Sequence, residues 1–157
     1  MTKKLNKSQE YIPDGHDISV LNECIDNPKI PLRELGKKLK ISFVTVMNRI
    51  KRLEKEGIIK KYTTRVNYDK LGYGIHAIIE VRISKGRFSE FAKALEKEPN
   101  IYKVYDTTGE FDSTLIGRFK TPKAMDKFLK KIQSCDFVER TYTKLILNTI
   151  KDEAMKI

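Results

Sequence analysis

The stretch that decides the fold is residues 32–59, LRELGKKLKISFVTVMNRIKRLEKEGII. Its first part has leucines at helical spacing after Pro31, a residue that suits the first position of a helix. Lys40-Ile41 then makes a tight turn. Ser42 can cap the next helix, and Gly57 suits the position after its last turn. The stretch therefore predicts two helices joined by a short turn.

A further helix is expected upstream of this pair. It begins at Asp17 as its N-cap, carries apolar residues at i, i+3 and i+7, and stops at Asn27-Pro28. Three short helices with a tight turn between the second and third outline a helix-turn-helix. Downstream, residues 58–66 are β-prone and basic, as expected for the hairpin of a winged helix-turn-helix.

The helix from Ser42 to Gly57 separates into two faces at about 100° per residue. Val46, Ile50 and Leu53 form the core side. The other side mixes an amide, guanidinium groups and a hydroxyl, which are the groups that read base edges and hold phosphates in a major groove. The alternative is an ordinary solvated face, on which Arg49 packs or pairs structurally. The predicted DNA-binding residues are Ser42, Phe43, Thr45, Asn48, Arg49, Arg52 and Lys55, with Lys60, Lys61 and Arg65 as backbone contacts.

The charge is consistent with a nucleic-acid partner. The 157 residues include 32 Lys+Arg and 21 Asp+Glu, for a net charge of +11. Residues 1–67 hold 15 basic and 8 acidic residues, and residues 68–157 hold 17 and 13, so the smaller segment carries most of the excess. An uneven basic surplus favours a polyanion such as double-stranded DNA. The alternative is a lysine-coated surface of the thermophilic type, because 24 of the basic residues are lysines.

The second half of the chain changes its period. Residues 75–84 alternate as a half-buried strand, followed by a helix that carries Phe88, Phe91, Ala92 and Leu95. Strands are expected from 101 to 108, from 113 to 119 and from about 138 to 150, with a second helix after Thr121-Pro122. The two βαβ halves match at an offset of 37 residues, as in Phe91 and Phe128. This order predicts a ferredoxin-like domain with both helices on one face of an antiparallel sheet.

The sequence thus predicts an α+β protein with an N-terminal winged helix-turn-helix and a C-terminal ferredoxin-like βαββαβ domain. The expected division is a tail at 1–15, a DNA-binding domain at 16–67, a hinge at 68–74 and a ferredoxin-like oligomerisation domain at 75–157. The second face of the sheet carries Ile78, Ile116 and Ile146, so we expect another copy to cover it. The predicted assembly is a dimer, extending to a tetramer or octamer.

Other function classes find little support in the sequence. No apolar run approaches the roughly 18 residues of a membrane span. The basic residues at the N-terminus have no apolar stretch behind them, so we expect no secretion signal. Cys24 and Cys135 lie far apart, which suits a reducing cytoplasm. His16 and His76 lack metal-ligand neighbours, and no catalytic set stands out, so we expect no cofactor and no enzyme activity.

The chain resembles the Lrp/AsnC (feast/famine) transcription regulators over roughly residues 16–151. The resemblance rests on Leu35-Gly36, Ile41-Ser42, Arg49-Ile50 and Gly57-Ile58-Ile59 in the helix-turn-helix, and on Gly72-Tyr73-Gly74, the turn Thr108 to Asp112, and Thr141-Tyr142-Thr143 in the sensing domain. There are departures: Gly36 replaces a usual alanine, and Gly109-Glu110-Phe111-Asp112 replaces Gly-Asp-Tyr-Asp.

The resemblance implies an amino-acid-like effector beside that turn. Asp112 would accept the ammonium, and turn amides with the hydroxyls of Thr141 and Thr143 would hold the carboxylate. The alternative is that Asp112 only forms the turn and Thr-x-Thr is only a good β sequence. The expected effector residues are Gly109, Glu110, Phe111, Asp112, Thr141 and Thr143. The main alternative function is a ligand-binding or interaction module, or a non-specific DNA-compacting protein without effector response.

Overall fold

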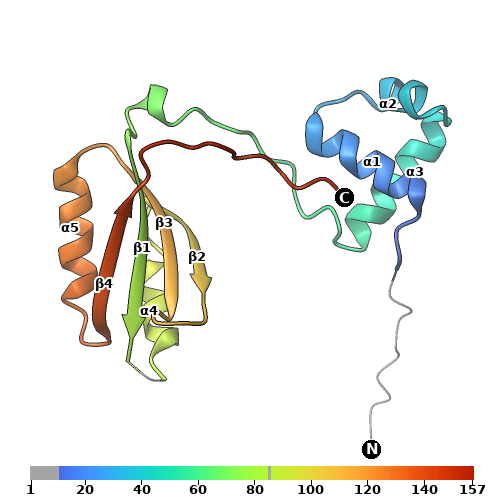
Figure 1. The fold of residues 1–157 in the computed structure, drawn as a ribbon. Helices are drawn as coiled ribbons and strands as arrows, with labels where there is room; N and C mark the ends of the chain where they lie inside the picture. Colours follow the sequence, from blue (N-terminus) through green and yellow to red (C-terminus); the bar gives the residue numbers. More distant parts are fainter. Residues whose placement is uncertain (1–10, 85) are drawn as a thin grey trace, which may run out of the picture. The chain divides into compact units, whose positions relative to one another are not determined.

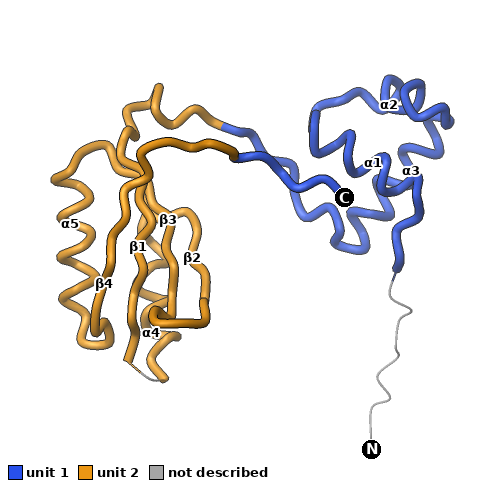
Figure 2. The backbone as a smooth tube through the Cα atoms, viewed as in Figure 1, with its two compact units in different colours: residues 1–65, 152–157 blue, residues 66–151 orange. Residues whose placement is uncertain are grey.

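The computed structural model describes residues 11–84 and 86–157, which form two compact units. Unit 1 comprises the chain up to Arg65 together with Asp152–Ile157, and unit 2 comprises Val66–Lys151 (Figure 2). The structure thus groups residues 152–157 with the first unit, whereas the sequence suggested that they continue the second domain. The expected tail at 1–15 lies mostly outside the described residues.

Unit 1 contains three helices, α1 (Gly15–Asp26), α2 (Leu32–Leu39) and α3 (Phe43–Lys55) (Figure 1). α1 begins earlier than the sequence suggested, because Asp14 rather than Asp17 is its N-cap. The Asp14 side chain accepts from the Asp17 amide, and the Asp17 side chain accepts from the Asp14 amide, which completes a capping box. The buried core of unit 1 consists of Val20, Leu21, Leu35, Val46, Ile50 and Leu53.

The turn between α2 and α3 is tight. Lys40 follows α2 as its C-cap with a φ of 55°, in the left-handed region, and the Ile41 amide donates to the Gly36 carbonyl at 3.0 Å. A Cβ at Gly36 would lie 2.8 Å from the Ile41 carbonyl oxygen. As predicted, Ser42 caps α3 by accepting from the Thr45 amide, and Gly57 follows α3 with a φ of 69°. These contacts fix how α3 leaves the turn.

The expected wing hairpin at 58–66 is not formed: residues 58–66 contain no strand. The run is β-prone but has no glycine, proline or asparagine at its centre, so it lacks the residues that favour a tight two-strand turn. Near the end of this segment, Arg65 pairs with Asp152 at 3.0 Å. Elsewhere in unit 1, Asn22 exchanges two hydrogen bonds with the Ile157 backbone. The C-terminal residues therefore contact both the segment after α3 and α1.

Unit 2 is a four-stranded antiparallel sheet with helices between its strands, as predicted. After a short 3₁₀ helix η1 (Asp69–Leu71), within the expected hinge at 68–74, it contains β1 (Ile75–Ile83), α4 (Phe88–Leu95), β2 (Ile101–Asp106), β3 (Ser113–Phe119), α5 (Pro122–Gln133) and β4 (Val138–Leu145). The strand order is β2-β3-β1-β4, and β2 and β4 end before the predicted residues 108 and 150.

One face of this sheet holds the core of unit 2. Alternate residues of β1, from Ala77 to Ile83, are buried together with Phe91 and Leu95 of α4 and Phe128 and Ile132 of α5. Both helices therefore cover the same face, and the residues between the buried ones point to the other side, which we call the open face. Among the described residues, no helix is long and apolar enough to cross a membrane.

Candidate nucleic-acid interface and effector site

α3 presents a solvent-exposed side whose composition suits DNA. Val44, Asn48, Lys51 and Lys55 are all exposed and follow one another at helical spacing on the side opposite to the buried Val46. The side chains of Asn48, Lys51 and Lys55 have no hydrogen-bond or ion-pair partner within residues 11–84 and 86–157. The amide and both ammonium groups are therefore available to a ligand.

The N-terminus of α3 adds further contacts. Ser42 caps the helix, and its hydroxyl lies 2.8 Å from that of Thr45. Phe43 is exposed, with the Arg33 guanidinium 6.0 Å from its ring. Of the predicted residues, Ser42, Phe43, Thr45 and Asn48 thus lie along one end of α3.

Arg49 has a structural position rather than a free one. Its Nη1 lies 2.7 Å from Asp14 Oδ2 and 2.7 Å from Asp17 Oδ1, and its side chain is only 19% exposed. The helical wheel accounts for this, since Arg49 lies about 70° from the centre of the core stripe of α3. Arg49 therefore ties α3 to the start of α1, the structural pairing that the sequence left open.

Arg52 is held more loosely. Its Nη2 lies 3.2 Å from Asp17 Oδ2, its guanidinium lies 4.6 Å from the centre of the Tyr11 ring, and its side chain is 45% exposed. The Asp17 carboxylate at the centre of this group has no exposed surface and also accepts from the Tyr11 hydroxyl. Tyr11, Asp14, Asp17, Arg49 and Arg52 thus form one network, which we call the α1–α3 network.

The network controls the charge of Asp17. Burial raises the pKa of the Asp17 carboxyl, but hydrogen bonds from Tyr11, the Asp14 amide and Arg49 outweigh burial and hold that pKa well below its usual range. Asp17 is thus ionised at neutral pH. Arg49 Nε is buried without a hydrogen-bond partner among the described residues. The negative charges of two carboxylates thus offset the positive charges of two guanidinium groups between α1 and the exposed side of α3.

The predicted backbone contacts lie in the segment after α3. Lys60, Lys61 and Arg65 are exposed. Tyr62 between them donates to Glu54 at 3.0 Å, and burial together with this hydrogen bond raises the pKa of Tyr62 to about 12. Arg65 forms an exposed pair with Asp152 that a phosphate can replace at little cost.

Lys51 lies on the exposed side of α3 but is not among the predicted DNA-binding residues. It follows Asn48 by three residues and is exposed, like Asn48 and Lys55. On the helical wheel it lies beside the predicted stripe, on the side away from Arg49, so a stripe centred opposite the core would have included it.

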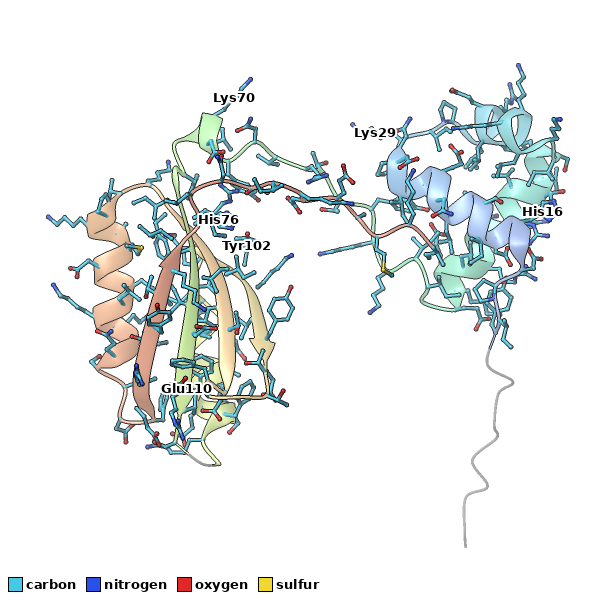
Figure 3. The ribbon with its side chains drawn as sticks, viewed as in Figure 1. His16, Lys29, Lys70, His76, Tyr102 and Glu110 are labelled. Carbon is cyan, nitrogen blue, oxygen red and sulfur yellow. The ribbon has the colours of Figure 1, made fainter. Side chains whose placement is uncertain are left out.

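The predicted effector turn borders a hollow of about 560 Å³ on the open face of unit 2. Figure 3 shows Glu110 at the end of the sheet where β2 leads into β3. Phe111 stacks on Tyr142, and Arg140 lies 3.3 Å from Glu110. The hollow is lined by Glu80, Thr107, Thr108, Glu110, Phe111, Thr114, Arg140, Tyr142 and Lys144. It thus combines both signs of charge with two aromatic rings.

Asp112 fastens the turn to the sheet. Its Oδ2 accepts from the Ile83 amide at 2.7 Å, where the pairing of β1 and β4 shifts register, and its own amide donates to the Val81 carbonyl at 3.1 Å. The Asp112 side chain is half-buried, and Oδ1 has no partner within the described part of the chain. Gly109, with a φ of 122°, makes the bend that brings Glu110 and Phe111 to the hollow.

The two threonines lie on the other face of β4. Thr141 and Thr143 pair in register with Val81 and Ile79, whose side chains are in the core, whereas Tyr142 pairs with Glu80 on the open face. The Thr141 hydroxyl accepts from Gln133 Nε2 at 2.7 Å. The structure therefore brings Glu110, Phe111 and Asp112 together at the turn and places both threonines away from the hollow.

The histidines and cysteines do not gather into a site. His76 Nε2 lies 2.8 Å from the Tyr102 hydroxyl, and the two residues are neighbours in Figure 3. Cys24 and Cys135 are free and half-buried, and burial raises the pKa of the Cys24 thiol. Within residues 11–84 and 86–157, no group of three or more His, Cys, Asp or Glu side chains could hold a metal ion.

Comparison with known proteins gives both units counterparts. Residues 76–155 match the family model of the Lrp/AsnC ligand binding domain, and residues 13–60 match that of a winged helix-turn-helix DNA-binding domain. The HTH-type transcriptional regulator FL11 of Pyrococcus furiosus is 38% identical over 141 residues, which cover 90% of this chain and 93% of that one. Regulator Ptr1 of Methanocaldococcus jannaschii is 34% identical over 88% of this chain and 95% of that one.

Solved structures show the same architecture. A transcriptional regulator of Neisseria meningitidis in complex with L-methionine superimposes with a TM-score of 0.87 at 26% identity, covering 90% of this chain and 94% of that one. LrpC of Bacillus subtilis superimposes with a TM-score of 0.84 at 28% identity, covering 91% of this chain and 100% of that one. Both proteins therefore share the fold of this chain over nearly their whole length.

Proposed function

This chain is a DNA-binding transcription regulator of the Lrp/AsnC family, and from that premise we propose that the exposed side of α3 reads operator sequence in a major groove. The observation that carries the proposal is the row Val44, Asn48, Lys51 and Lys55. The carboxamide of Asn48 can bond an adenine edge with two hydrogen bonds, and Val44 can contact a thymine methyl group. Lys51, Lys55, Lys60 and Lys61 suit phosphates, which position the protein without carrying sequence information.

Two alanine variants separate contacts that read the base sequence from contacts to phosphates. We expect Asn48→Ala to bind a duplex selected from a random pool by the wild type about ten- to a hundredfold more weakly, at roughly 1–3 kcal/mol per bidentate contact, with random duplex less affected. Lys60→Ala should weaken both duplexes alike and lower the slope of log affinity against log salt by about 0.9 for each phosphate that it no longer neutralises. Fluorescence anisotropy at several salt concentrations measures both effects.

The control is Lys127→Ala, which removes an exposed lysine of α5 in unit 2 and should change neither binding nor slope. An Asn48→Ala variant that keeps the wild-type ratio between selected and random duplex would contradict the reading role. It would favour the alternative of a non-specific DNA-compacting protein, which needs no reading face.

We further propose that unit 2 binds a small amino acid or a close relative beside the turn 109–112. Asp112 suits the ammonium better than Glu110, because Asp112 is half-buried while Glu110 is 64% exposed, and water screens an exposed charge pair. The ligand carboxylate would take turn amides and Arg140, whose exposed pair with Glu110 is cheap to exchange. The rings of Phe111 and Tyr142 border the space for the ligand's side chain.

Asp112→Asn tests this site, because an asparagine Oδ1 can still accept from the Ile83 amide while the charge is lost. We expect the variant to bind no member of an amino-acid panel that the wild type binds, since an ammonium would lose its charged partner. Isothermal titration calorimetry measures binding, and DNA binding without ligand should remain intact because α3 belongs to unit 1.

Thr141→Val and Thr143→Val report on the other expected residues. A loss of about 1–2 kcal/mol in either would place the ligand on the helix-facing side of β4 rather than in the hollow. Equal binding by wild type and Asp112→Asn would mean that Asp112 only holds the turn. No binding of any compound by the wild type would leave a regulator without this sensor.

A further inference from the structure

Tyr11, which precedes α1, and Asp17 of α1 both contact Arg52 of α3. The Tyr11 ring lies under the Arg52 guanidinium at 4.6 Å, and the Tyr11 hydroxyl donates to the buried Asp17 carboxylate. Asp17 in turn accepts from Arg52 Nη2 at 3.2 Å. Arg52 is thus held by one aromatic face and one carboxylate, both outside α3.

Arg52 keeps donors for a ligand in spite of these contacts. Its side chain is 45% exposed, and its Nε and Nη1 have no hydrogen-bond partner within residues 11–84 and 86–157. Arg49 is different, since it is mostly buried and engaged by both Asp14 and Asp17. Because Arg49 already balances much of the Asp17 charge, the carboxylate can orient Arg52 without fully occupying it.

We propose that Tyr11 and Asp17 are positioning residues that hold the Arg52 guanidinium in the orientation it uses on DNA. The inference rests on the proposed reading role of α3 and adds a specificity determinant from outside that helix. A free arginine loses rotamer freedom when it binds, whereas one already held against a ring and a carboxylate loses less. The hydrogen bonds of a planar guanidinium also depend on its orientation more strongly than those of a compact ammonium group do.

A double-mutant cycle tests this positioning. Tyr11→Leu should weaken binding to a duplex selected by the wild type about three- to tenfold, the range expected for removing a partly desolvated cation–π contact. Random duplex should be affected less. Tyr11→Phe keeps the ring and should bind within about twofold of the wild type. In an Arg52→Ala background, Tyr11→Leu should have no further effect, because the group that it positions is gone.

The controls separate positioning from folding. Asn22→Ala changes another contact of α1, with the Ile157 backbone, and should leave DNA binding unchanged. Hydrogen exchange of the α1 and α3 amides should be the same in Tyr11→Phe and the wild type. Tyr11→Leu binding as the wild type, or weakening binding equally with and without Arg52, would overturn the positioning role. Wild-type discrimination by Arg52→Ala would overturn it too, while the Asn48→Ala result decides the reading role separately.

Discussion

At the scale of single residues, Asp17 has the most demanding environment in unit 1. Its carboxylate is fully buried, yet it lies between two guanidinium groups, a phenol and a main-chain amide. A buried charge is tolerated only when its partners replace water, and here they do so. The capping box that starts α1 and the ion pairs that hold α3 thus share one side chain.

This environment predicts a pH-dependent stability. The folded-state pKa of Asp17 is lowered, so its ionised form stabilises unit 1 above the unfolded-state value of about 3.9. That contribution is lost as the pH falls below about 4 towards the lower folded-state pKa. Asp17→Asn should therefore reduce the free energy of unfolding by about 3 kcal/mol at pH 7, with a difference that shrinks towards pH 3.

Urea titrations at pH 7, 5 and 3, followed by NMR of the α1 and α3 amides, measure this difference. Asp26→Asn is the matched control on the same helix, because its pair with Lys156 is exposed and should be worth less than about 1 kcal/mol. A loss for Asp17→Asn that is equally large at pH 3 would contradict the assignment of the charge to Asp17.

At the scale of elements, the turn between α2 and α3 depends on Gly36. The family resemblance leads one to expect alanine at this position, and the structure accounts for the glycine. A Cβ would lie 2.8 Å from the Ile41 carbonyl oxygen, a main-chain atom that cannot move without widening the turn. The small residue therefore sets how closely α3 follows α2.

Gly36→Ala should destabilise unit 1 although alanine is the better helix former by about 1 kcal/mol. Overpacking against backbone costs typically about 1–3 kcal/mol, so we expect a net loss of about 1 kcal/mol. Gly15→Ala is the control, since a Cβ there meets nothing within 4 Å and should leave stability unchanged or raised. Thermal unfolding, monitored by hydrogen exchange of the α2 and α3 amides, compares the stability of the two variants. A Gly36→Ala variant more stable than the wild type would contradict the close approach of residue 36 to the Ile41 carbonyl.

Elements with local signals were predictable from the sequence. The cap at Ser42, the glycine after α3 and the alternation of β1 each depend on adjacent residues, and the structure has them at those positions. The predicted start of α1 was wrong because Asp14 and Asp17 are both good N-cap residues. Asp14 caps the helix, whereas Asp17 is its N3 residue and completes the capping box. The strands expected at residues 58–66 are not formed, because strand propensity does not supply a partner strand.

In the candidate sites too, some features are set within one element and others by contacts between elements. Asn48 and Lys55 follow from helical period alone, whereas the engagement of Arg49 depends on where α1 begins. In unit 2, the placement of Thr141 and Thr143 follows from which face of β4 is buried, and that is set by pairing with β1. Patterns within one element could be read from the sequence, and contacts between elements could not.

At the scale of the whole molecule, the open face of unit 2 carries apolar side chains that no helix of unit 2 covers. Ile78 and Ile116 are paired in register on this face, and Ile146 lies on the same side, opposite His76. Tyr102, Tyr105 and Tyr142 are each about half exposed. We propose that a second copy of the chain covers the apolar part of this face, since an exposed apolar patch on a small sheet favours pairing with another copy.

The dimer would also bring two reading helices to one operator, with half-sites about one helical turn, ~34 Å, apart. Ile116→Lys should therefore shift the protein towards the 18.3 kDa monomer and weaken operator binding, because a lysine on an apolar contact leaves its charge buried without a partner. Leu145→Lys is the matched control: Leu145 is 54% exposed and pairs with the buried Ala77, so it lies on the other face and should leave the assembly intact. Light scattering at micromolar concentration measures the mass, and a wild-type monomer, or an Ile116→Lys variant that assembles like the wild type, would show that the open face is not the contact.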